Sequence, residues 1–154
     1  MNADINKLIL CFVCLVFCAC SPAPTAEVPS PNITEQAWYS ESVSQLVTIH
    51  RDADLLLKSG KRDLAGARIT EAQAIMTRVL TAPQPTLAAM EVCSDLDQLY
   101  ATMLLSNHHY GWARLLFQKN QARWSSWKPQ TTESERRRKQ AEAGIAECDR
   151  AIPQ

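Results

Sequence analysis

The chain has 154 residues, and its 16 lysine and arginine residues balance its 16 aspartate and glutamate residues. This length fits one domain of ordinary size and leaves little room for a large cofactor-binding domain. Zero net charge argues against a dedicated nucleic-acid-binding protein, because such proteins are usually strongly basic. The four glycines are too few for a phosphate-binding loop that places three or four of them in one motif.

The first twenty residues hold four of the six cysteines and an apolar run over 8–17 that follows Lys7. A short apolar run behind a positively charged start is typical of a secretory signal, and it is shorter than the ~20 residues of a permanent membrane span. Cys11 and Cys14 have the C-x-x-C spacing of a metal site. Their apolar surroundings lack the polar second shell that orients metal ligands. The sequence therefore predicts a signal peptide over 1–19 and no metal site there.

The signal ends in a motif built around Cys20, within Leu-Val-Phe-Cys-Ala-Cys-Ser at 15–21. This motif resembles the lipobox of bacterial lipoprotein precursors, in which a small residue such as Ala19 precedes the cysteine. Phe17 departs from the family pattern, which usually has leucine there. The resemblance covers only the first 21 residues. It implies that Cys20 becomes an acylated N-terminus in a lipid bilayer, and that Ser21 directs the protein to the outer membrane. A plain secreted protein or an uncleaved anchor is the alternative.

A spacer follows, with four prolines among the twelve residues 21–32. Such a composition favours an extended, polyproline-like chain. We interpret 20–33 as the lipid anchor and a linker that holds the domain away from the membrane. A proline-rich ligand for a recognition domain is the other interpretation.

Residues 34–154 are predicted to form the domain. Apolar residues recur there at three- and four-residue steps, which indicates helices, and no segment alternates as a strand would. The first helix is expected to begin at an Asn32–Glu35 capping box and to end before Gly60. Thr86 is expected to cap the third helix, and Thr132 with Glu135 the last. The expected ranges are 32–58, 63–81, 86–105, 109–127 and 132–152. We predict an all-α bundle of four or five helices.

Cys93 and Cys148 are the two cysteines beyond the signal and the anchor, and both lie on apolar helix faces. Because the periplasm is oxidising, we predict a disulfide that pins the last helix to the third. Two separately buried thiols are the alternative.

The sequence offers little that points to catalysis. His108 and His109 are adjacent, so their side chains would leave a helix about 100° apart and not share a metal. Asp95 and Asp97 are two residues apart and lie on different helix faces. The G-x-S-x-G motif of serine hydrolases is absent. We therefore predict no catalytic residue, no metal and no cofactor. A cell-wall enzyme using carboxylates from distant segments is a remote alternative.

The balanced net charge conceals a basic, tryptophan-rich segment. Residues 100–132 hold four cations, no acid and three of the four tryptophans, and a basic run follows at 136–139. The tryptophans spread over about 120° of the helix, which is wide for a core stripe, and tryptophan and arginine often anchor interfaces. The candidate partner contacts are Trp112, Arg123, Trp124, Trp127 and Lys128. Alternatively, the aromatic rings fill the core while the cations reach outward.

These features favour a non-enzymatic outer-membrane lipoprotein whose periplasmic domain binds another envelope or secretion-complex protein. It would assist assembly, targeting or regulation of that complex. The layout of lipobox, proline-rich linker and small helical bundle is similar to that of the helical pilot lipoproteins of secretion systems. The alternative is a lipid- or peptidoglycan-binding module that uses the basic, tryptophan-rich helix. Nucleic acid is not expected as a partner.

Overall fold

The computed structural model describes residues 32–152, which form one compact unit of helices. The signal peptide, Cys20 and nearly all of the predicted linker lie outside the described residues. A short 3-10 helix precedes five α-helices, and the described residues contain no strand. The elements are η1 (Ile33–Glu35), α2 (Ala37–Lys58), α3 (Arg62–Val79), α4 (Leu87–Ser106), α5 (Tyr110–Ser126) and α6 (Thr132–Ala151). The prediction of an all-α bundle is confirmed.

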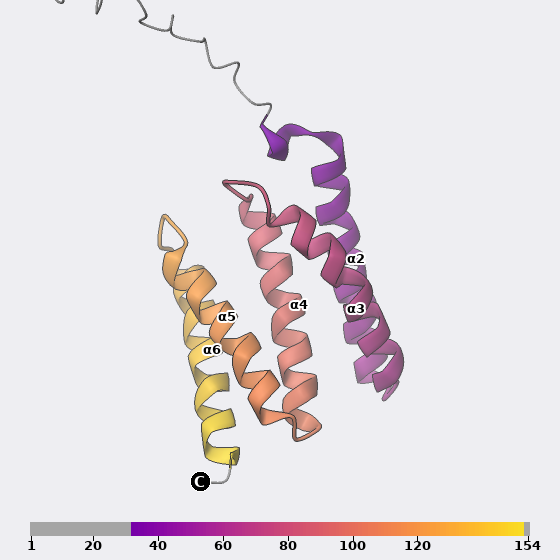
Figure 1. The fold of residues 1–154 in the computed structure, drawn as a ribbon, viewed down its shortest axis with the longest axis vertical. Helices are drawn as coiled ribbons and strands as arrows, with labels where there is room; N and C mark the ends of the chain where they lie inside the picture. Colours follow the sequence, from indigo (N-terminus) through magenta and orange to yellow (C-terminus); the bar gives the residue numbers. More distant parts are fainter. Residues whose placement is uncertain (1–31, 153–154) are drawn as a thin grey trace, which may run out of the picture. The chain divides into compact units, whose positions relative to one another are not determined.

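Helix α4 lies in the middle of the bundle, between two helical hairpins (Figure 1). Helices α2 and α3 pack on each other on one side, and α5 and α6 pack on each other on the other side. Helices α3 and α5 both contact α4, but their backbones do not come within 8 Å of each other. A cavity lies over α4 between these two helices.

Local signals place most of the helix ends. Gly60 has a φ of 75° directly after α2, and glycine adopts this left-handed conformation at little cost. The hydroxyl of Thr86 caps α4 by accepting from the backbone N–H of Ala89. Asn32 caps the short helix η1, and its amide donates to Glu35 at 2.9 Å. The α-helix that was expected to begin at this cap begins after η1.

The predicted capping box of the last helix is wrong by one residue. Thr131, not Thr132, is the N-cap, and its hydroxyl accepts from the backbone N–H of Ser134 at 3.1 Å. The hydroxyl of Ser134 in turn accepts from the backbone N–H of Thr131 at 2.8 Å. Ser134 is buried and therefore takes the place that was expected for Glu135. Thr131 and Thr132 could both cap the helix, and the observed cap is the one whose partner three residues later is the buried Ser134.

Two apolar cores lie on opposite sides of the bundle. The larger one joins α2, α3 and the first half of α4, with Leu46, Ile69 and Leu96 almost fully buried. The smaller one joins the end of α4 to α5 and α6 around Phe117. Separate cores of this kind allow each hairpin to bury its own apolar face against a different part of α4.

The predicted disulfide is absent. Cys93 and Cys148 are both buried free thiols, and each belongs to a different core. Their immediate neighbours show how far apart they are. Ser94 contacts Trp124 on α5, whereas Asp149 contacts Arg114 on the same helix. These two positions on α5 are separated by about 15 Å at 1.5 Å per residue, while a disulfide needs Cα atoms within about 7 Å.

We expect both thiols to resist alkylation in the folded protein. Burial raises the pKa of Cys93 to about 11 and also raises the pKa of Cys148, and the thiolate is the reactive form. Peptide-level mass spectrometry should show no alkylation of Cys93 or Cys148 under native conditions and alkylation of both after unfolding in the absence of reductant. Additions that appear only after reduction would demonstrate a disulfide and contradict the structure.

Candidate functional site: an apolar groove and a buried ion cluster

The structure separates the residues that were predicted to contact a partner. Trp124 is only 1% exposed, and its indole N–H donates to the hydroxyl of Ser94 at 2.8 Å. Arg123 is also buried. Neither side chain is available to a partner, so these two predictions are wrong. Trp127 is half-buried with its ring edge against Trp124, and Lys128 is exposed.

Trp112 is the exposed tryptophan of α5, with 67% of its surface accessible. It lies about 120° around the helix from Trp124 at 100° per residue, so one ring can enter the core while the other faces solvent. The arc of tryptophans expected from the sequence is wide because Trp124 occupies a core position and Trp112 a surface position.

Arg123 is buried because it pairs with a buried carboxylate of α4. Asp97, whose side chain is 1% exposed, accepts from Arg123 at 2.8 Å and from Lys119 at 3.1 Å. Asn120 accepts from Arg123 and donates to the backbone carbonyl of Ser94. Each buried charged or amide group of this set therefore has a hydrogen-bond or ion-pair partner, which burial of a charge requires. We call Asp97, Lys119, Asn120 and Arg123 the buried ion cluster.

The remaining cation within α5 is also paired. Arg114 donates to Asp149 of α6 at 2.6 Å. Residues 100–132 contain no acid, and three of their four cations pair with carboxylates on the helices to either side. Asp97 and Asp149 therefore compensate two of the four positive charges of this segment in the folded domain.

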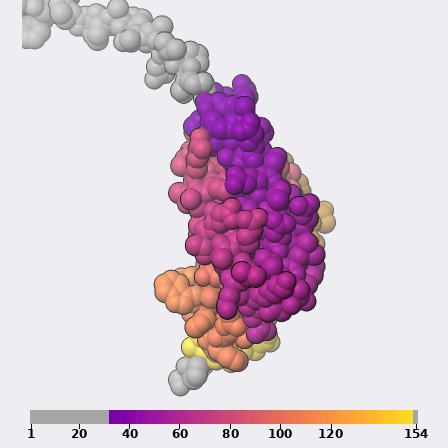
Figure 2. Space-filling model, turned by 90° about the vertical axis from the view of Figure 1, so that its right-hand side faces the viewer, coloured from indigo at the N-terminus to yellow at the C-terminus, as the bar shows by residue number. Residues whose placement is uncertain are grey.

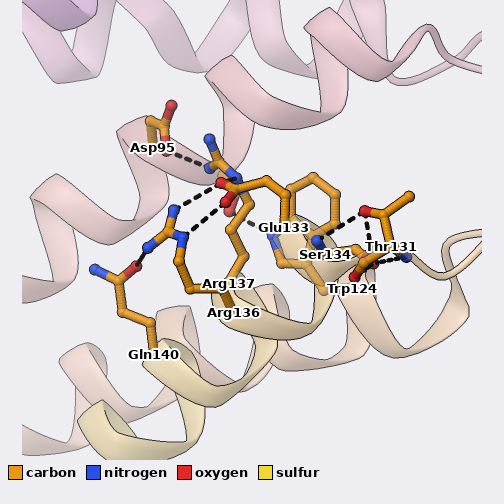
Figure 3. A network of polar contacts seen from close by, with 9 residues as sticks. Asp95, Trp124, Thr131, Glu133, Ser134, Arg136, Arg137 and Gln140 are labelled. Carbon is orange, nitrogen blue, oxygen red and sulfur yellow. Dashed lines mark hydrogen bonds and ion pairs between the residues drawn. The ribbon is translucent and has the colours of Figure 1, made fainter.

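The basic run 136–139 is also paired, mostly with carboxylates of its own helix, and Figure 3 shows the contacts of Arg136 and Arg137. Arg137 donates to Asp95 of α4 at 2.5 Å and to Glu133 at 2.7 Å, and its guanidinium lies 5.3 Å from the ring centre of Trp124. Hydrogen bonds from Arg136, and then from Arg137, lower the pKa of Glu133 to about 2. Arg138 pairs with Glu142 and Lys139 with Glu135.

An apolar groove lies where α4 is left open between α3 and α5. Its volume is about 710 Å³. Trp112 and Leu115 are 67% and 55% exposed beside it, and Figure 2 shows a knob of the orange helix α5 projecting from the surface near α3. We call this cavity the α3/α5 groove; its lining residues are Thr70, Gln73, Tyr100, Leu104, His109, Trp112, Leu115, Leu116 and Lys119.

Two further cavities, of about 550 and 370 Å³, lie along the other side of α4 and are more polar. One carries a single carboxylate, Glu147, and the other carries Asp95, which is paired with Arg137. None of the three cavities brings together the two carboxylates that glycoside hydrolysis uses. Within residues 32–152, no group of three histidine, cysteine, aspartate or glutamate side chains is placed to hold a metal ion.

Comparison with protein-family models, with curated proteins and with solved structures found no match to this chain. None of the helices in the described part combines the length and the apolar character that crossing a bilayer requires. The α3/α5 groove is therefore the main feature from which a function can be argued.

Proposed function

We propose that this protein is a non-enzymatic outer-membrane lipoprotein, anchored through acylated Cys20, whose periplasmic domain binds another envelope protein in the α3/α5 groove. The proposed role is assistance in assembly, targeting or regulation of an envelope or secretion complex. The anchor rests on the lipobox-like sequence at 15–21. The binding role rests on the groove.

The observation that carries the binding role is the exposure of Trp112 and Leu115 at the groove. An exposed tryptophan beside an apolar cavity is unfavourable unless a partner covers it, and tryptophan is among the commonest interface anchors. The groove holds apolar rings and aliphatic side chains with few polar groups, which suits the apolar face of a protein segment.

The paired cations argue against an anionic lipid or wall polymer as the principal ligand. Arg114 and Arg123 already bond carboxylates of this domain, and Lys119 shares Asp97 with Arg123. Attraction to an anionic surface depends on exposed, uncompensated cations, so these pairs weaken it. A protein that buries apolar surface in the groove does not depend on that attraction.

The groove is also far from the end at which the chain enters the domain. The backbone N–H of Thr86 donates to the hydroxyl of Tyr39, which places the start of α4 beside the start of α2. Tyr100 and Leu104 reach the groove from the last turns of α4, about 21–27 Å further along at 1.5 Å per residue. A domain tethered near Asn32 would thus carry its binding surface toward its far end.

We expect Trp112→Ala to abolish capture of an envelope protein from mildly solubilised membranes. Removing this ring deletes the largest exposed apolar side chain at the groove while leaving both cores intact. The measurement is affinity capture of the full-length lipoprotein followed by quantitative mass spectrometry, which also reports acylation of Cys20.

Leu55→Ala is the matched control, because Leu55 is an exposed apolar residue on α2 that does not line the groove. This variant should recover the partner at the level of the unaltered protein. Recovery of the partner by Trp112→Ala, or recovery of no stoichiometric envelope protein by the unaltered chain, would contradict the proposal.

A further inference from the structure

The α3/α5 groove ends at a half-exposed cation that belongs to the buried ion cluster. We propose that Lys119 makes the groove selective for a partner helix that carries an acidic side chain at that end. This inference rests on the proposed binding role and adds the chemistry of the partner: one amphipathic helix, apolar along one face and acidic at one end of that face.

The shape of the groove fits one helix. On α5 its lining extends from His109 to Lys119, which corresponds to about 15 Å, or roughly three turns, at 1.5 Å per residue. Helix α4 forms the floor, and α3 and α5 form the walls, with their Cα atoms more than 8 Å apart. A helix laid in such a trough presents apolar residues at three- and four-residue spacing along its whole length.

The charge of the groove is unbalanced. Asp97 is the one carboxylate of the buried ion cluster and is bonded to two cations, so the cluster carries one excess positive charge. Arg123 is buried, whereas the side chain of Lys119 is 48% exposed and lines the groove. No lining residue is acidic. The excess charge is therefore presented to the groove through Lys119, where a carboxylate from the partner would compensate it.

The position of this charge decides the kind of partner. At the edge of an apolar cavity, a new ion pair is less screened than one in open solvent. An acidic residue near Lys119 should therefore strengthen binding, whereas a basic residue there should weaken it. Arg114 does not supply this preference, because its own carboxylate, Asp149, neutralises it outside the groove.

The test uses full-length protein in nanodiscs and fluorescently labelled, alanine-based helical peptides of sixteen residues. Each peptide carries three leucines at helical spacing and one charged residue, glutamate or lysine, at one end. Pairs with the charge at the N-terminal or the C-terminal end cover both directions of docking. In one of the two pairs, the glutamate peptide should bind about fivefold more tightly than its lysine counterpart at low salt. This difference in affinity should shrink as salt is added.

Lys119→Met should remove the preference while leaving the apolar contribution, because Asp97 retains its bond to Arg123. Lys128→Met is the matched control, since Lys128 is exposed at the end of the same helix region and does not line the groove. It should keep the full preference. The melting temperature of each variant verifies that the domain is folded.

Three results would overturn the inference. They are equal affinity for the two peptides of every pair, an undiminished preference in Lys119→Met, and self-association of the lipoprotein that excludes all the peptides. If none of the peptides binds while capture still depends on Trp112, the inference fails and the proposed function stands. If the peptides are discriminated while no envelope protein is captured, the proposed function fails instead.

Discussion

Replacing Asp97 with alanine is expected to lower the free energy of unfolding by about 3–5 kcal/mol. Among residues 32–152, the substitution removes the only carboxylate bonded to Arg123, and that guanidinium would remain buried without a counter-charge. Lys119 can turn toward solvent, because its side chain is half-exposed. The side chain of Arg123 is buried and cannot reach solvent in the same way. Urea denaturation followed by circular dichroism would measure the loss.

Asp52→Ala provides a matched surface control. Asp52 pairs with Arg68 at 2.8 Å, but both side chains are about one-third exposed, so its loss should cost less than about 1 kcal/mol. Replacing both members of the buried pair, as Asp97→Leu with Arg123→Met, should recover much of the stability lost by the single change. A single Asp97 variant as stable as the Asp52 variant would show that the buried charge pair is not formed.

Local signals in the sequence predicted several helix ends well, because these ends are encoded by a few neighbouring residues. Gly60 ends α2 and Thr86 begins α4 as expected, and both effects depend only on backbone conformation and one nearby hydrogen bond. The pairing of Cys93 with Cys148 failed because it depends on how α4 and α6 are shifted along each other. That shift is set by contacts through α5, which no local pattern reveals.

The candidate site was predictable only in part. Helical periodicity gives the angle between Trp112 and Trp124, but it does not say which of them faces the core. The absence of any acid in residues 100–132 was visible in the sequence, but it was interpreted as a basic interface and not as a need for carboxylates from other helices. Arginines buried in such a segment need carboxylates from neighbouring helices, and Asp97 lies on the preceding predicted helix. The groove itself arises from the separation of α3 and α5, which is a tertiary property.

Gly144→Ala is expected to destabilise the protein by about 1–3 kcal/mol, although alanine normally favours a helix over glycine by about 0.5–1 kcal/mol. A Cβ atom at Gly144 would lie 2.7 Å from three ring carbons of Phe117, which is buried between α5 and α6. The ring is rigid and almost fully buried, with the cavity of about 550 Å³ on one side. Either α6 must move away from α5 or the ring must shift from its place in the smaller core.

The matched control for this contact is Gly66→Ala in the second turn of α3. A Cβ atom there would meet only the terminal methyl of Met103 at 3.6 Å, an ordinary contact, so helix propensity should prevail and stability should rise slightly. Phe117→Leu should partly relieve the Gly144 variant, because the smaller side chain vacates the space that the new methyl needs. Thermal unfolding of the two alanine variants therefore has opposite expected signs. A Gly144 variant that melts at or above the unaltered protein would mean that α5 and α6 are not in the close contact seen here, and that the surface carrying Trp112 is placed differently.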